Sequence, residues 1–323
     1  MPNQLTFNNH FKFGYNGEWF NQRQSPDDKF IAKFGRAESI LTFSDAGVDA
    51  SRKIAMSTDR PIYVCTSGGI DSEIVVKFFL KAKVNFTVAM LEFKNKENEH
   101  DLKYAYKLCD ALGLRYKKFV LDVDNWYNSP EAIEIARRST SCYITQLCQS
   151  WLLAQINEIG GFPVMGTGDP GIYRSVPSDF SYTRYDFTTH NARLEDDWYL
   201  HVGEDISCFA GAFLKTANLV GAPFFYCYTP ELMYSYLTDN VIEQLVSDKT
   251  KFRFTTKEKY AIYSKYFGLE ERPKYTGTEH LKCLEKSNAM LELINPHPTH
   301  IARYRYRYYD LLSLLNPAPE SSR

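Results

Sequence analysis

Short apolar runs alternate with longer amphipathic stretches between residues 61 and 165. The apolar, β-branched runs predict strands buried on both faces, and the stretches between them predict helices with one apolar side. The predicted strands are 61–65, 86–93, 115–121 and 162–165, and the predicted helices are 73–81, 99–112 and 130–159, the last of which could break near Ser139. Such alternation forms a parallel sheet through right-handed crossovers, with helices on both faces. The sequence therefore predicts an α/β fold with a Rossmann-like sheet.

The sequence on either side of this region predicts two smaller parts. Residues 1–45 are polar and aromatic with turn residues between short runs, which predicts short strands or a hairpin. A capped amphipathic helix is expected from Ser44, its N-cap, to Met56. The pattern after residue 231 is mainly helical. We expect a small N-terminal appendage (1–45), the α/β domain (46–230) and a mainly helical C-terminal region (231–323).

Composition and charge exclude several classes of protein. Of the 323 residues, 44% are hydrophobic and 24% are charged, as in ordinary globular domains. The formal net charge is −1, so no overall charge attracts nucleic acid. No apolar run has the length of a membrane span, and the N-terminus lacks a signal-peptide pattern. The seven cysteines are scattered without a C-x-x-C pair, which argues against a disulfide framework or a structural zinc site. We expect a cytoplasmic protein.

A Ser/Gly-rich turn joins the first predicted strand to the helix that follows it. Its residues are Ser67, Gly68, Gly69, Ile70, Asp71 and Ser72. The glycines let the backbone approach a phosphate, the serine hydroxyls can donate hydrogen bonds, and the next helix N-terminus favours an anion. A carboxylate beside that anion needs a cation, so Asp71 is a natural Mg²⁺ ligand. A plain turn that caps a helix is the alternative, but the S-G-G-x-D-S spacing favours a polyphosphate site. It is neither a Walker A motif nor a dinucleotide fingerprint.

A second Gly-rich loop, G-T-G-D-P-G, follows the last predicted strand at residues 166–171. Both loops come at the carboxyl ends of strands, where ligands bind in sheets of this type. We therefore expect the backbone of Gly166 and Gly168 to contact the same ligand. Asp169 could share a metal ion with Asp71. An ordinary turn is the alternative interpretation.

The segment CTSGGIDS, residues 65–72, resembles the PP-loop of the N-type ATP pyrophosphatases, whose fold is termed adenine nucleotide alpha hydrolase-like. In style it is nearest to the synthetase domain of asparagine synthetase. The resemblance implies that ATP, with Mg²⁺, is cleaved to AMP and pyrophosphate and that an adenylated intermediate is attacked by a nucleophile, usually nitrogen. GTGDPG is similar to the loop that completes pyrophosphate and Mg²⁺ binding in this family. It lacks the second acid of the asparagine synthetase form.

Three further side chains are expected at the site. The family holds adenine at the end of the second strand, which implies a contact with Leu91, although a core leucine is the alternative. Arg138 could bind the α-phosphate or a substrate carboxylate, or form a solvated pair with Arg137. The segment Arg272-Pro273-Lys274 resembles an R-x-K segment in which the lysine reaches the phosphates, and a mobile ammonium suits that role. Asp71 and Lys274 are therefore the expected catalytic residues.

Three functions are compatible with these patterns. An adenylating, C–N bond-forming ligase would activate a carboxyl or amide group of a small molecule for attack by an amine or ammonia. No segment resembles a glutaminase domain, so ammonia would come from solution or from a partner. A second hypothesis is modification of a nucleobase in tRNA, DNA or a free nucleotide, with Tyr304–Tyr309 as a stacking surface, although a packed amphipathic helix explains that segment better. The third is a non-catalytic adenine-nucleotide sensor. A homo-oligomer would be compatible with any of them.

Overall fold

A four-stranded parallel sheet, in the order β5-β4-β3-β6, lies at the centre of the protein in a computed structural model. The structure describes residues 10–21, 25, 27–139, 143–175, 197–203, 208–251, 253–273, 275–283 and 303–317. The sheet is formed by β3 (Ile62–Cys65), β4 (Thr87–Phe93), β5 (Tyr116–Leu121) and β6 (Phe162–Met165). Val64 of β3 pairs with Val88 of β4 and with Val164 of β6, and all three are fully buried. The predicted α/β class is confirmed, and each predicted strand begins within one residue of the observed start.

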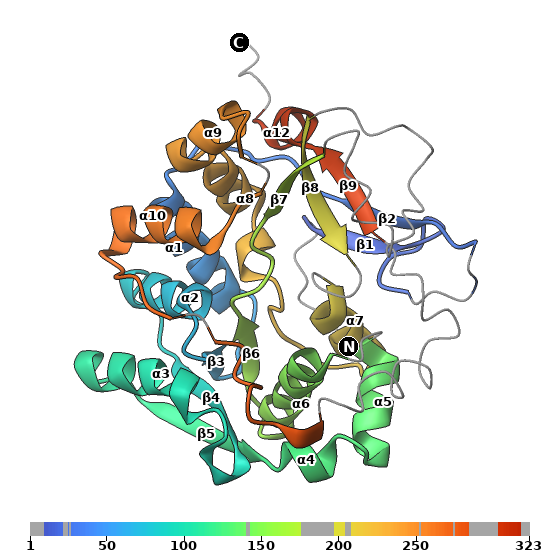
Figure 1. Ribbon diagram of the computed structural model, residues 1–323, viewed down its shortest axis with the longest axis vertical. Coiled ribbons are helices and arrows are strands. Elements are labelled where there is room, and N and C mark those ends of the chain that lie inside the picture. The colour runs from blue at the N-terminus through green and yellow to red at the C-terminus, as the bar shows by residue number, and fades with distance from the viewer. Residues whose placement is uncertain are drawn as a thin grey trace.

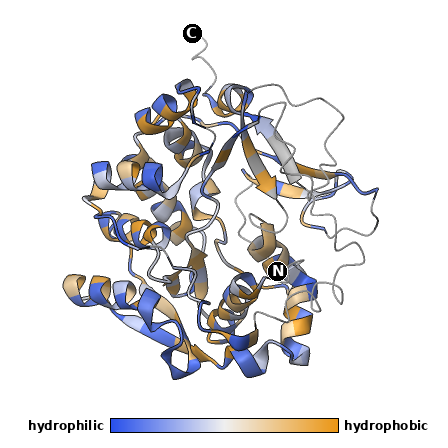
Figure 2. Ribbon diagram, in the orientation of Figure 1, coloured by the Kyte–Doolittle hydropathy of each residue, from blue (hydrophilic) through white to orange (hydrophobic). Residues whose placement is uncertain are grey.

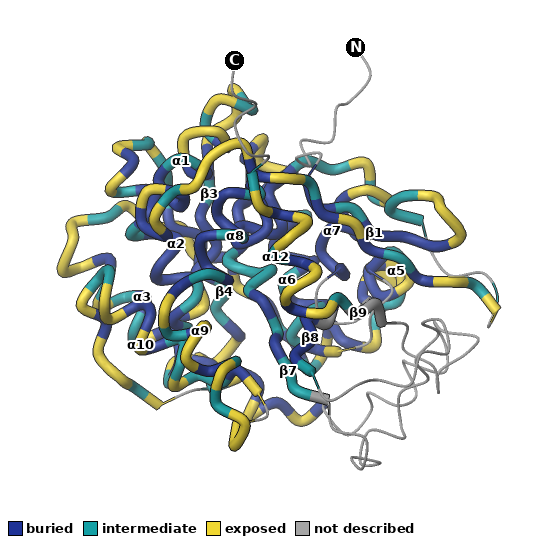
Figure 3. The backbone as a smooth tube through the Cα atoms, turned by 90° about the horizontal axis from the view of Figure 1, so that it is seen from above, coloured by how far each residue is buried: buried dark blue, intermediate teal, exposed yellow. Residues whose placement is uncertain are grey.

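Helices cover both faces of this sheet (Figure 1). They are α2 (Ile70–Lys81), α3 (Glu99–Leu112), α4 (Val123–Trp126), α5 (Pro130–Ser139) and α6 (Ile144–Glu158). The chain moves outward from β3 through β4 to β5 and then returns to β6 on the other side of β3. Right-handed crossovers therefore place α2 and α3 on one face and α6 on the other. Hydrophilic and hydrophobic residues alternate along these helices (Figure 2). Buried backbone runs through the centre of the molecule (Figure 3).

Three helix boundaries differ from or refine the prediction. The expected helix 130–159 is two helices, and the buried Ser139 that ends the first donates a hydrogen bond to Ser150 in the second. α2 begins at Ile70 rather than Glu73, because Gly69 is the N-cap and the first turn already contains the end of the Ser/Gly motif. The predicted N-cap Ser44 is wrong. α1 (Phe43–Met56) is capped two residues earlier by Thr42, whose hydroxyl accepts from the backbone N–H of Asp45.

Two smaller sheets lie next to each other on one side of the parallel sheet (Figure 1). β1 (Lys12–Tyr15) and β2 (Phe30–Lys33) form an antiparallel hairpin, as expected for the N-terminal segment. β7 (Gly171–Ser175), β8 (Asp197–Gly203) and β9 (Arg303–Arg307) form an antiparallel sheet in that order. The helical interpretation of the Tyr/Arg segment is wrong over β9, because strand pairing with β8 satisfies its backbone and its alternating residues suit a strand.

Helices make up most of the remaining C-terminal part. They are α7 (Phe209–Thr216), α8 (Pro230–Leu237), α9 (Asn240–Ser247), α10 (Thr256–Phe267) and α12 (Tyr308–Leu315). α10 packs against α2, the helix that follows the Ser/Gly turn. None of the helices in the described part of the chain is long and apolar enough to cross a membrane. The division at residues 45 and 230 stays a prediction.

Candidate functional site

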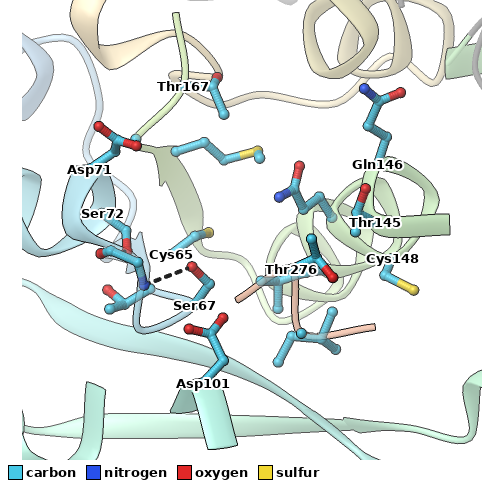
Figure 4. Close-up of a pocket in the computed structure, with 18 of the residues that line it drawn as sticks. Cys65, Ser67, Asp71, Ser72, Asp101, Thr145, Gln146, Cys148, Thr167 and Thr276 are labelled. Atoms are coloured by element: carbon cyan, nitrogen blue, oxygen red, sulfur yellow. Dashed lines mark hydrogen bonds between the residues drawn. The ribbon is translucent and has the colours of Figure 1, made fainter. Parts of the chain in front are cut away.

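The Ser/Gly turn after β3 depends on a glycine at position 68. Gly68 has φ +100, and a Cβ there would lie 2.1 Å from the backbone oxygen of Asp101. A side chain is therefore excluded by both conformation and space. The next residue, Gly69, caps α2, and its N–H donates to the Ser67 hydroxyl at 3.2 Å (Figure 4). The first N–H groups of α2 have no acceptor within the helix, so this end of the helix can bind an anion.

The Gly-rich loop after β6 lies directly against the start of α2. A Cβ on Gly166 would be 3.0 Å from the Cα of Ser72 and 3.2 Å from the backbone oxygen of Asp71. A hydrogen bond also fixes this loop: the Cys227 thiol donates to the Gly168 backbone oxygen at 3.0 Å. The two strand-end loops thus meet where the chain reverses direction across the sheet, which is the usual ligand position in such folds.

A half-buried lysine joins the two loops. Lys259 of α10 lies with its Nζ 3.1 Å from Asp71 Oδ2, and the same Nζ forms an ion pair with Asp169. One turn further along α10, the Tyr263 hydroxyl donates to Asp71 Oδ1 at 2.7 Å. The Tyr226 hydroxyl donates to the backbone oxygen of Asp71 at 3.0 Å. The carboxylates of Asp71 and Asp169 therefore both contact the Lys259 ammonium.

Burial and charge set the protonation of this cluster. Burial is the main cause that raises the pKa of Asp71; the charge of Lys259 opposes the shift and that of Asp169 adds to it. Burial alone would lower the pKa of Lys259, but the charges of Asp169 and Asp71 outweigh it and hold the pKa above its usual value. The ammonium therefore stays charged at neutral pH.

The donor set fits a metal ion that arrives with a phosphate ligand. Among the residues that the structure describes, no group of three or more His, Cys, Asp or Glu could hold a metal ion. Asp71 and Asp169 supply two carboxylates directed at one point. Mg²⁺ commonly takes one or two carboxylates and completes its shell with phosphate oxygens and water. These residues thus suit Mg²⁺ bound to a polyphosphate better than a resident metal.

A cavity of about 400 Å³ opens beside the two loops, within the range of small-molecule sites. The predicted residues that line it are Ser67, Gly69, Asp71, Ser72, Leu91, Gly166, Gly168 and Asp169. Its opposite wall is α6, from which Thr145 and Gln146 project (Figure 4). Gly68 and Ile70 line a smaller adjoining cavity of about 220 Å³ on the side of Lys259.

A third carboxylate, Asp101, lines both cavities from the first turn of α3. Its side chain is buried, and burial raises its pKa to about 6, against the charge of His100. No hydrogen bond to this carboxylate is formed within the described residues. Asp101 therefore adds a buried acid to the wall, although no sequence motif indicated it.

One predicted residue, Arg138, is not brought to the site. The Arg138 side chain pairs with Glu134 on α5 at 2.7 Å and does not line either cavity among the described residues. Lys274 lies outside the described residues. Lys259 occupies the position between the acids, and sequence reasoning missed it. A lysine four residues before Tyr263, on a helix face with the buried Ile262, was the available signal.

Comparison with known proteins gives one sequence match. Residues 45–161, which extend from α1 through the loop after β3 to the end of α6, match the family described as asparagine synthase. No curated protein matches the chain. The match stops before the loop that carries Asp169 and before α10, so it does not include the cationic part of the site.

Two solved structures are similar at low identity. The NH3-dependent NAD synthetase from Campylobacter jejuni subsp. jejuni NCTC 11168 is 14% identical, with 79% of this chain and 94% of that chain covered and a TM-score of 0.32. The NMN synthetase from Francisella tularensis is also 14% identical, with 72% and 98% covered and a TM-score of 0.31. Scores this low carry no argument about the function of the chain.

Proposed function

We propose that this chain, whose residues 45–161 form a domain of the N-type ATP pyrophosphatase (PP-loop) superfamily, is an ATP-dependent synthetase that cleaves ATP to AMP and pyrophosphate. The observation that supports this most is the cluster in which Asp71 and Asp169, from two different strand ends, share the Lys259 ammonium beside a helix N-terminus. Anion-binding N–H groups, two acids for a metal and one fixed cation are the parts that a triphosphate requires.

The phosphate side of the site follows from this arrangement. The N–H groups at the start of α2 would bind the terminal phosphates, and Asp71 and Asp169 would hold Mg²⁺. The bound ion would neutralise charge that develops on the departing pyrophosphate. The Lys259 ammonium has three donors, so it can keep a carboxylate contact and donate to a phosphate oxygen at the same time. Its raised pKa keeps that positive charge in place at neutral pH.

The other half of the cavity would hold the adenosine and the acceptor. Leu91, at the end of β4, offers an apolar contact for the adenine ring. The facing wall of α6 presents Thr145, Gln146 and Gln149, which are neutral groups that donate and accept hydrogen bonds. We propose that a carboxyl or amide group of a small molecule is adenylated there and is then attacked by an amine or ammonia.

Nucleobase modification in a nucleic acid and a purely sensory role remain hypotheses. The Tyr/Arg segment that could have stacked on bases is engaged within the protein. The Tyr306 hydroxyl donates to the backbone of Ala32, Arg307 pairs with Asp197, and the Tyr308 hydroxyl donates to Leu237. A steep salt dependence of binding to tRNA or single-stranded DNA would be the sign of a nucleic-acid substrate.

The proposal is tested by ATP–pyrophosphate exchange. The enzyme is incubated with Mg-ATP, labelled pyrophosphate and a panel of carboxylates and amides, and incorporation of label into ATP reports reversible adenylation. We expect Asp71→Asn to reduce exchange about 100-fold or more, as loss of a charge-stabilising group does at other active sites. The matched control is Asp49→Asn, which removes an exposed acid paired with Lys53 on α1 and should leave exchange unchanged. ADP and phosphate as products would overturn the proposal.

A further inference from the structure

Arg272, in the segment that follows α10 and outside the family match, contacts the Ser/Gly turn at residues 67–72, which we call the phosphate loop. Its Nη2 donates to the backbone oxygen of Gly68 at 2.7 Å, and its Nη1 donates to Glu73 Oε2 at 2.7 Å. The guanidinium also lies over the ring of Tyr104 on α3, 4.6 Å from the centroid. One planar group therefore joins the loop, α2 and α3.

The backbone of Arg272 is fixed as firmly as its side chain. The Tyr260 hydroxyl donates to the Arg272 backbone oxygen at 3.0 Å, and the Arg272 N–H lies 2.9 Å from the same hydroxyl. Tyr260 is the residue after Lys259 on α10. The helix that supplies the cation between the two acids thus also anchors the arginine that contacts the loop.

The contact with Gly68 fixes the direction of a whole peptide group. The carbonyl of residue 68 and the N–H of residue 69 belong to one plane and point in opposite directions. Because Arg272 holds the carbonyl on one side, the N–H of Gly69 must point to the other, where it meets the Ser67 hydroxyl. Glycines flank that peptide on both sides, so nothing in the loop's own side chains prevents it from rotating.

The ion pair between Arg272 and Glu73 offsets a negative charge near the phosphate loop. Glu73 is buried in the first turn of α2, and a second negative charge there would repel a bound polyphosphate. Arg272 and Lys77, at 2.9 Å, are its two cationic partners. Their charges offset that of the carboxylate at short range in a partly dehydrated position.

We propose that Arg272 is a positioning residue for ATP cleavage, which holds the 68–69 peptide in its phosphate-binding orientation and offsets the charge of Glu73. This inference rests on the proposed function of the site. Only a planar fork can reach the Gly68 oxygen and the Glu73 carboxylate together, so lysine is not an equivalent replacement. The binding of pyrophosphate and ATP depends on contacts with the phosphate loop, whereas AMP makes fewer contacts with it. Loss of Arg272 therefore weakens the binding of the first two selectively.

The experiment measures the binding of Mg-ATP, Mg-pyrophosphate and AMP by calorimetry for the wild type, Arg272→Met and Arg272→Lys. A charged hydrogen bond of this kind corresponds to about a 10- to 100-fold change in affinity. We expect such losses for Mg-ATP and Mg-pyrophosphate, and less than about a threefold loss for AMP. Arg115→Met is the control, because Arg115 bonds to Asn85 on the exposed surface at the start of β5.

Chemical rescue separates positioning from general destabilisation. Low concentrations of methylguanidinium should restore part of the Mg-pyrophosphate affinity of Arg272→Ala, and methylammonium should not. If Arg272→Met and Arg272→Ala do not fold, Arg272→Lys, which keeps the positive charge, is used to compare the binding of the three ligands. Equal losses for AMP and pyrophosphate, or no loss in Arg272→Lys, would overturn the inference. A wild type that binds no Mg-ATP would count against the proposed function instead.

Discussion

Replacement of Lys259 by Met tests the charge cluster directly. The change keeps the length of the side chain but leaves Asp71 and Asp169 facing each other without a cation. Removal of one partner from a buried ion pair destabilises a protein by about 3–5 kcal/mol. Lys259 is 15% exposed, whereas the two acids are 29% and 27% exposed, so water compensates part of the loss. We therefore expect the free energy of unfolding to fall by about 2–3 kcal/mol at neutral pH.

Urea unfolding of four proteins measures this effect: the wild type, Lys259→Met, Asp71→Asn and the double variant. The double variant should be less destabilised than the sum of the single ones, because the second change removes an acid that the first left unpaired. Addition of MgCl₂ should restore part of the stability of Lys259→Met, since a divalent cation binds the same two acids. Lys96→Met, which breaks an exposed pair with Glu99, should change stability by less than about 0.5 kcal/mol. A loss below 1 kcal/mol for Lys259→Met, with additive effects at Asp71, would refute the reasoning.

Three further predictions concern single positions. Gly68→Ala should weaken Mg-ATP binding at least about 10-fold, because Gly68 has φ +100 and an added Cβ would lie 2.1 Å from the backbone of Asp101. Gly113→Ala, at φ +61 in open space, should leave binding unchanged and lower the free energy of unfolding by about 1 kcal/mol. Equal binding losses in the two variants would contradict this prediction. Burial raises the pKa of Asp101 from 3.8 to about 6 in the folded state. Between these two pH values the folded state binds the proton more tightly than the unfolded state, so the full free-energy cost of burying the charged carboxylate applies only above pH 6. Asp101→Asn should therefore gain stability over the wild type between pH 4 and pH 6, by at most about 3 kcal/mol in urea titrations, and a gain independent of pH would exclude this cause. Tyr263→Phe should lower the free energy of unfolding by about 1–2 kcal/mol through loss of the 2.7 Å bond to Asp71, and no change in urea unfolding would show that the bond is not formed.

Local sequence signals predicted the sheet and the position of the Ser/Gly turn after β3. The apolar β-branched runs at β3 and β6 are short and bounded by turn residues, so strand limits were set by nearby residues alone. The loops after these strands meet because parallel strands end at the same edge, and that geometry follows from the fold class. Gly113 ends α3 in the left-handed conformation that favours glycine.

Long-range contacts were the part that sequence patterns did not predict. Lys259 bonds to Asp71 across 188 positions, and nothing near either residue encodes the other. The segment 303–307 was interpreted as a helix because its pairing partner, β8, is about a hundred residues away. The β propensity of one segment is a weak signal, and whether the segment forms a strand depends on the strand with which it pairs. The sequence places Arg272 only in the R-x-K segment, and no local pattern predicts its contact with the Gly68 carbonyl 204 positions away.

The separation between the phosphate loop and its cations has a consequence for synthesis of the chain. Gly68 and Arg272 are 204 positions apart. At about 5–20 residues per second, a ribosome adds Arg272 some 10–40 seconds after the loop. During that interval Glu73 lacks Arg272 and Asp71 lacks Lys259, at a helix end made to attract anions. A nascent or truncated chain that ends before α10 therefore has the Ser/Gly motif without the charges that complete the site, and under the proposed function nucleotide binding requires the chain to extend past Arg272.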